Sequence, residues 1–198
     1  ASDELEGRCA GYPGNDKAAE YIADVFKKSG LKPGGEGGTW FQKFKVGGRE
    51  TRNVVGLLEG KDPEFRGEYV VAGAHYDHVG TAETKDFGRL GSKAGTDTIW
   101  NGADDNGSGT TCLLALARVF GEGRLEARRS IVFIAFSGEE AGLVGSRWYT
   151  QHPLGSIDKH VFMLNLDMVG RNPTRAMEIH GVGSAAGGVV RKAVERAV

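Results

Sequence analysis

The sequence predicts a three-layer α/β/α domain with a mixed, largely parallel sheet, and two observations support this fold class. Apolar runs without alternation occupy residues 70–71, 131–136 and 161–164. Such runs are typical of strands that are buried on both faces beneath helices. Segments with apolar residues at helical spacing alternate with these runs along the chain. At 198 residues, the chain has the length of a single domain, which we place at residues 1–198.

The first expected elements are a helix and two antiparallel strands. Residues 15–29 have apolar side chains at helical spacing, Asn15 or Asp16 can cap the start, and Gly30 follows the end. Residues 39–46 and 51–60 have strand patterns, and the Gly-Gly pair between them suits a hairpin turn. We expect this hairpin at an antiparallel edge of the sheet.

The later elements alternate between strand and helix. The patterns predict strands over 68–75, 130–137, 160–167 and 176–181, and helices over 106–120, 141–150 and 184–198. A polar, glycine-rich loop fills 79–103. Cys112 lies in the apolar pattern of the 106–120 helix and is expected to be a core thiol, so we expect no disulfide with Cys9.

Charge and hydropathy exclude two classes of partner. The 25 basic residues nearly balance the 26 acidic ones, for a net charge of −1, which argues against nucleic acid or a membrane surface as a partner. No apolar run approaches the roughly 18 residues that a membrane span requires.

Potential metal ligands follow three of the predicted strands. The 68–75 strand ends in "AHYDH", the 130–137 strand leads into "GEE", and the 160–167 strand ends in Asp167. The segment "NGADDNGSG" at 101–109 adds Asp104 and Asp105. Binding sites in open α/β sheets form beyond the carboxyl ends of the strands, so we expect these side chains near one another.

Each of these residues also has a purely structural explanation. His75 could be a hydrogen-bonded core histidine, Asp104 or Asp105 could cap the 106–120 helix, and Glu139 with Glu140 could sit in the first turn of a helix. Asp167 is harder to explain in this way, because an unpaired carboxylate after an apolar run is costly to bury.

The combination favours a metal site. Acidic clusters at one end of a sheet crowd negative charge, and one or two divalent cations relieve that crowding. One histidine with several carboxylates suits Zn²⁺, Mn²⁺ or Co²⁺ better than Mg²⁺ or Ca²⁺. Ligands drawn from distant segments are typical of catalytic metal sites.

Four motifs resemble the co-catalytic di-zinc aminopeptidase family, which includes secreted bacterial leucyl aminopeptidases and, more distantly, glutamate carboxypeptidases and glutaminyl cyclases. They are "GAHYDHVG", "NGADDNGSGT", "FSGEEAGLVGS" and "LNLDMVGR", in the family's order. The resemblance implies a zinc-exopeptidase-like fold, a peptide substrate, and a secreted or periplasmic metallo-aminopeptidase that removes N-terminal residues.

The resemblance also implies a role for each matching metal ligand. His75 and Asp167 would bind a first zinc, Asp105 would bridge two zincs, and Glu140 would bind the second.

Two further residues receive catalytic roles from the same resemblance. Glu139 would act as the general base on the attacking water and then protonate the leaving amine, while Asp77 would orient His75 by accepting its other ring proton. Asp104 and His78 would lie around the ligands without binding the metal, or would simply be loop residues.

One departure from the family pattern concerns the second metal. The resemblance implies a further histidine ligand well downstream of Asp167, but only 31 residues follow, and their one histidine, His180, lies in a predicted strand. We therefore expect a truncated N-terminal part of a catalytic domain, with one zinc site complete and the other short of one ligand. An uncovered sheet edge would then favour self-association.

Two other functions stay open on the same fold. A glutaminyl-cyclase-like acyltransferase would use a single zinc, and a receptor-like module would have lost its metals. The intact set of acidic and histidine residues favours the peptidase over both.

Overall fold

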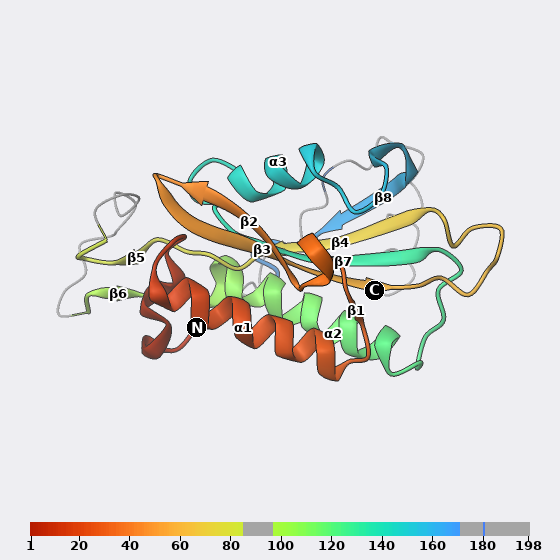
Figure 1. Cartoon of the computed structure of the whole chain (residues 1–198). Coiled ribbons are helices and arrows are strands. Elements are labelled where there is room, and N and C mark those ends of the chain that lie inside the picture. Colours follow the sequence, from red (N-terminus) through yellow and green to blue (C-terminus); the bar gives the residue numbers. More distant parts are fainter. Residues whose placement is uncertain (85–96, 171–179, 181–198) are drawn as a thin grey trace.

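The computed structural model describes residues 1–84, 97–170 and 180, and these form a three-layer α/β/α unit (Figure 1). The helices α1 (Pro13–Lys28) and α2 (Gly109–Gly121) cover one face of a sheet, and α3 (Val144–Gln151) lies on the other. The predicted fold class is confirmed.

The main sheet is mixed. Its strands are β1 (Lys32–Pro33), β2 (Phe41–Val46), β3 (Arg49–Leu58), β4 (Tyr69–His75), β7 (Ser130–Phe136) and β8 (His160–Asn165). The order is β1-β3-β7-β4-β8, and β2 also pairs with β3. The pairs β4–β7 and β4–β8 are parallel, whereas β3 runs antiparallel to β1, β2 and β7. The predicted hairpin at 47–48 joins β2 to β3 and belongs to the antiparallel part.

The main core lies between the sheet and the layer of α1 and α2. Phe26 of α1 is fully buried, and its ring centroid lies 6.2 Å from that of Phe133 on β7. Leu113 and Ala117, one turn apart on α2, are fully buried in the same cluster. This apolar contact fixes α2 against the end of β4, and thereby places the loop that precedes α2 beside His75.

Several boundaries differ from the sequence prediction. The helix α1 begins at Pro13, where proline fits the first turn, so neither Asn15 nor Asp16 caps it. Asn15 instead lies fully buried and accepts hydrogen bonds from Thr51 and Ser137. The predicted helix at 141–150 begins only at Val144, because left-handed backbone at Gly142 and Leu143 precedes it.

Two burial predictions were wrong. Cys112 is exposed on α2, because the buried stripe of this helix passes through Leu113 and Ala117 instead. The strand β8 alternates between exposed and partly buried residues, with Val161 and Met163 both 47% exposed. Val161 and Met163 share one face of the strand, so their exposure shows that this face is not buried in the described structure.

Short elements surround this framework. The loop predicted at 79–103 contains β5 (Gly80–Thr81) and β6 (Ile99–Trp100), which pair antiparallel. The turns η1 (Asp3–Arg8), η2 (Glu36–Gly38), η3 (Ala103–Ser108) and η4 (Ile157–Lys159) complete the described chain. The predicted helix at 184–198, and the predicted strand at 176–181 apart from His180, lie outside it. None of the described helices is long and apolar enough to cross a membrane.

Candidate metal centre

The site lies where β4, β7 and β8 end. His75 is the last residue of β4 and pairs in register with Phe136, the last residue of β7. The backbone N–H of Leu166, just after β8, donates to the carbonyl of Gly73 on β4. Three chain segments therefore leave the sheet at nearly the same level, which brings their following residues together.

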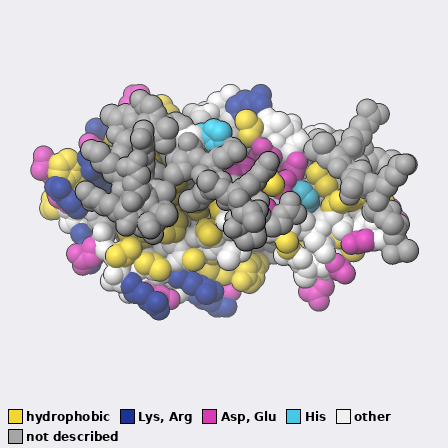
Figure 2. Space-filling view, turned by 180° about the vertical axis from the view of Figure 1, so that it is seen from behind, with side chains coloured by type: hydrophobic (Ala, Val, Ile, Leu, Met, Phe, Trp, Pro, Cys, Tyr) yellow, Lys and Arg dark blue, Asp and Glu magenta, His cyan; other side chains and the backbone are white. Residues whose placement is uncertain are grey.

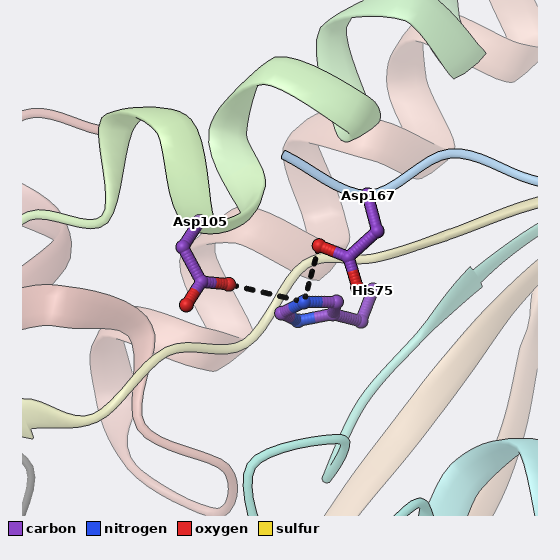
Figure 3. Close-up of side chains that lie close together, drawn as sticks. All are labelled: His75, Asp105 and Asp167. Atoms are coloured by element: carbon purple, nitrogen blue, oxygen red, sulfur yellow. Dashed lines mark ion pairs between the residues drawn. The ribbon is translucent and has the colours of Figure 1, made fainter. Parts of the chain in front are cut away.

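His75, Asp105 and Asp167 form a first group of ligand atoms (Figure 3). His75 Nε2 lies 3.2 Å from Asp105 Oδ1 and 3.5 Å from Asp167 Oδ1. Both carboxylates point at the same edge of the imidazole ring. A nitrogen and carboxylate oxygens at this spacing fit zinc, whose ligands lie about 2.0–2.2 Å from the ion.

The pKa of His75 reflects this surrounding charge. The imidazole is 3% exposed, and burial alone would lower its pKa. The carboxylates of Asp105, Asp77 and Asp167 outweigh burial and raise the pKa to about 11. The carboxylates around His75 therefore favour a cation at this ring. In the metal-free protein that cation is a proton, and a metal ion would replace it.

Asp105 joins the first group to a second. Its Oδ1 faces His75, whereas its Oδ2 lies 3.9 Å from Nδ1 of His78. His78 Nδ1 is also 2.8 Å from Glu140 Oε1. His78, Asp105 and Glu140 thus form a second group of potential ligands. One carboxylate with an oxygen toward each group has the geometry of a bridge between two ions.

The second group contains a residue that sequence reasoning left in the loop. His78 was placed outside the ligand set, yet its ring nitrogen reaches both Asp105 and Glu140. The only signal in the sequence was the spacing in "HYDH", three residues after His75.

Asp77 lies beside the Nδ1 side of the His75 ring, where the sequence prediction placed it. His75 Nδ1 lies 3.2 Å from the main-chain carbonyl of Asp77, whereas the Asp77 carboxylate is farther away, at 3.6 Å. The carboxylate instead accepts hydrogen bonds from the backbone N–H groups of Glu139 and Glu140. Asp77 therefore contacts His75 Nδ1 with its backbone carbonyl and its carboxylate, and the same carboxylate also holds the glutamate turn.

Glu139 lies beside the first group. Its Oε2 is 3.9 Å from His75 Nε2, and its side chain is 32% exposed. Burial raises the pKa of Glu139, and the neighbouring carboxylates of Asp77 and Glu140 raise it further, against the lowering effect of His75. A carboxylate with an elevated pKa, reachable from solvent, suits the transfer of a proton.

The structural alternatives for these acidic residues are not supported by the described geometry. Glu139 and Glu140 precede α3, which begins only at Val144. Asp105 lies within η3 and makes no capping hydrogen bond to α2. Asp104 belongs to neither ligand group, and its Oδ1 accepts a hydrogen bond from the backbone N–H of Gly170.

Arg8 holds the two loops that carry His78 and Asp105 through hydrogen bonds. No sequence pattern indicated this role for Arg8. Its side chain is buried and donates to the backbone carbonyls of Tyr76, Asn101 and Gly102. These carbonyls belong to the two loops that carry His78 and Asp105. Burial lowers the pKa of Arg8, an effect that the nearby carboxylates oppose.

Figure 2 shows acidic side chains gathered beside a histidine on one face of the molecule.

Comparison with known proteins agrees with this chemistry. The family model described as peptidase family M28 matches residues 53–197. Aminopeptidase YwaD from Bacillus subtilis is 32% identical over 131 residues, which cover 66% of this chain and 24% of that protein. Leupeptin-inactivating enzyme 1 from Streptomyces exfoliatus is 26% identical, covering 86% of this chain and 33% of that protein. The chain thus spans about a quarter to a third of these relatives.

Solved structures share the fold over most of the chain. A Zn-dependent exopeptidase from Parabacteroides distasonis superposes with a TM-score of 0.69 at 22% identity, covering 94% of this chain and 64% of that one. Tannerella forsythia glutaminyl cyclase superposes with a TM-score of 0.67 at 25% identity, covering 94% and 65%. The family match over residues 53–197, taken with the ligand groups at the strand ends, shows that this chain belongs to peptidase family M28.

Proposed function

We propose that the chain is part of a zinc-dependent aminopeptidase that hydrolyses the first peptide bond of a peptide substrate. The observation that carries this proposal is the pair of ligand groups that share Asp105, with Glu139 next to them. At family level, a metal-dependent aminopeptidase agrees with the match to peptidase family M28 and with the aminopeptidase relatives.

The donor set supports zinc as the metal. His75 would bind through Nε2, Asp167 and Asp105 through carboxylate oxygens, and Glu140 would bind the second ion. When bound, zinc would lower the pKa of a water molecule to about 7, so that hydroxide forms near neutral pH.

Glu139 would handle the protons of the reaction. Its carboxylate accepts a proton as the water oxygen attacks the peptide carbonyl, and it returns that proton to the amine nitrogen as the C–N bond breaks. The raised pKa of Glu139 favours this exchange, because a base whose pKa lies closer to neutrality both accepts and donates readily. Asp77 would keep this carboxylate in place through the backbone of residue 139.

A zinc-dependent acyltransferase that cyclises N-terminal glutamine is the second candidate. The fold shared with the Tannerella forsythia glutaminyl cyclase supports it. The second ligand group favours the peptidase, because a cyclase of this fold would need only one metal.

The test is a comparison of activities on the zinc-loaded chain. We expect slow release of the anilide from aminoacyl-anilide substrates, abolished by chelation. Glu139→Gln should lower that rate by about 10²–10⁴-fold and leave zinc content unchanged. Glu64→Gln, at an exposed position away from the site, serves as the matched control.

The other outcomes identify the alternatives. Cyclisation of N-terminal glutamine without anilide cleavage would replace the peptidase by the acyltransferase. A folded chain that binds no zinc and has neither activity would favour the receptor-like module.

A further inference from the structure

We infer that Asn53 is a positioning residue for the reaction, because its side chain fixes the turn that carries Glu139 and Glu140. Asn53 lies on β3 and is fully buried. It belongs to neither ligand group, so its effect on the reaction must pass through the turn. The inference rests on the proposed function for the role of Glu139, and adds the residue that keeps this carboxylate in place.

The side-chain amide of Asn53 bonds to both ends of the glutamate turn, which comprises residues 137–145. Its Oδ1 accepts a hydrogen bond from the backbone N–H of Ser137 over 3.1 Å, and its Nδ2 donates to the carbonyl of Gly145 over 2.9 Å. A backbone N–H can only donate and a carbonyl can only accept, so the two ends need an acceptor and a donor. A side-chain amide supplies both, whereas aspartate lacks the donor and leucine lacks both groups.

The two ends of the turn approach each other closely beside Asn53. A Cβ at Gly145 would lie 2.2 Å from the carbonyl oxygen of Ser137 and 2.4 Å from Asn53 Oδ1. Glycine at position 145 therefore lets the ends meet, and Asn53 holds them together. Within the turn, the backbone N–H of Val144 donates to the carbonyl of Gly138, which closes the same loop from inside.

The start of the turn is anchored a second time, through the side chain of Ser137. Its hydroxyl lies 2.8 Å from that of Thr51 and donates to Asn15 Oδ1 over 3.2 Å. These three residues are at most 1% exposed, so water does not compete for the bonds. Gly145, at the other end, has no side chain, and Asn53 supplies the anchor there.

Fixed ends matter for the reaction because Glu139 lies only two residues after the start of the turn. The carboxylate of Asp77 holds the backbone N–H groups of Glu139 and Glu140 from the loop after β4. With Asn53 at the ends and Asp77 in the middle, the turn has little freedom to move the Glu139 carboxylate. A misplacement of about 1 Å can cost about 100-fold in rate, so the loss of either hold should slow the reaction.

Asn53 could alternatively serve only the fold, by satisfying buried backbone groups. Gln42 provides the matched control, because it is buried in the same network but bonds to Asn53 Nδ2 and to the carbonyl of His152, beyond the last turn of α3. Gln42→Met should therefore lower the free energy of unfolding, as Asn53→Leu does. It should leave Asn53 bonded to both ends of the glutamate turn.

The first measurement is backbone hydrogen exchange in the metal-free chain, under conditions where each variant is folded. Asn53→Leu keeps the size of the side chain and removes both bonds to the turn. We expect the amide protons of Glu139, Glu140 and Val144 to exchange at least about tenfold faster through local opening. The amide protons of β4 should change only with global stability. In Gln42→Met the turn should exchange within about twofold of the wild type.

The second measurement is hydrolysis of an aminoacyl-anilide by each variant at saturating zinc. Asn53→Leu should lower kcat by about 10–100-fold and leave KM within about twofold, because the Glu139 carboxylate moves while the contacts of the bound substrate stay. Gln42→Met should keep both values near those of the wild type. If Asn53→Leu does not fold, Asn53→Asp replaces it: aspartate keeps the acceptor for Ser137 and loses the donor to Gly145, so exchange should rise at Val144.

Three results would overturn the inference. They are wild-type exchange of the turn in the Asn53 variant, an unchanged kcat in that variant, and losses of the same size in Gln42→Met. A wild-type chain that hydrolyses no anilide would instead reject the proposed function, and the exchange measurements alone would then decide whether Asn53 holds the turn.

Discussion

The carboxylate of Asp77 accepts a hydrogen bond from the backbone N–H of Glu139, with 3.1 Å between Oδ1 and the nitrogen. Its other oxygen accepts from the backbone N–H of Glu140 over 3.3 Å. Asp77 is 1% exposed, so this contact is shielded from water. These two hydrogen bonds join the loop after β4 to the turn after β7, next to the ligand groups.

Removing this carboxylate should destabilise the fold. Asp77→Ala leaves two buried N–H groups without their acceptor, and we expect the free energy of unfolding to fall by about 2–4 kcal/mol. Asp77→Asn should recover part of this loss, because its amide oxygen still accepts one of the bonds. Urea denaturation of the metal-free proteins measures both changes. An unchanged stability for Asp77→Ala would show that water or another group replaces the carboxylate without cost.

Arg8 should matter for both stability and metal binding. Arg8→Met removes a donor from three backbone carbonyls, of which that of Gly102 keeps a hydrogen bond from the backbone N–H of Gly107; this predicts a loss of about 2–4 kcal/mol in the free energy of unfolding. Arg8→Lys should be milder, since an ammonium group reaches fewer of these carbonyls. Zinc affinity should fall in both variants, because the loops bearing His78 and Asp105 lose their common support. Arg124→Met, at an exposed residue, should stay within about 0.5 kcal/mol of the wild type.

Metal binding should release a proton and strengthen with rising pH. The pKa of His75 is raised to about 11 in the metal-free site, so near neutral pH the imidazole carries a proton that an incoming ion must displace. Between about pH 6 and pH 8 the zinc affinity should rise by about tenfold per pH unit. Calorimetry in two buffers of different ionisation enthalpy counts the protons released. An affinity that stayed constant over this range would mean that His75 is neutral before the metal arrives.

The two cysteines should react at very different rates with a thiol reagent. Cys112 is exposed on α2, whereas Cys9 is 1% exposed. One thiol per chain should react rapidly in the native state, and the second only on unfolding. Cys112→Ser should abolish the rapid phase, and Cys9→Ser should retain it. Two rapid phases in the wild type would contradict the burial of residues 9–10 beside η1.

Local patterns in the sequence predicted much of the fold. Continuous apolar runs predicted the buried strands β4 and β7, and the Gly47-Gly48 pair predicted the hairpin between β2 and β3. The errors concerned the burial of single residues, because burial depends on which face of a helix or strand packs against the core. Cys112 lies one position from the buried Leu113, and a helical pattern defines its apolar face only to within about one residue.

Part of the candidate site could likewise be predicted from the sequence, and part of it could not. His75, Asp105, Glu140 and Asp167 were selected from the sequence because of their motifs, and the structure brings them into two groups that share Asp105. The sequence did not predict the hydrogen bonds of Arg8, or those that the Asp77 carboxylate accepts from the backbone of the glutamate turn. Their bonds reach backbone atoms of segments distant in the chain, and backbone donors and acceptors leave no residue-type pattern to detect.

Four of the potential metal ligands, at positions 75, 105, 140 and 167, come from four separate segments of the chain. During synthesis on a ribosome, Asp167 emerges long after His75, and the site cannot close until β8 has paired with β4. A metal ion captured earlier would meet an incomplete set of ligands and bind weakly. Zinc uptake should therefore be a late event in the life of the nascent chain, and a bound ion would join segments that lie far apart along the backbone.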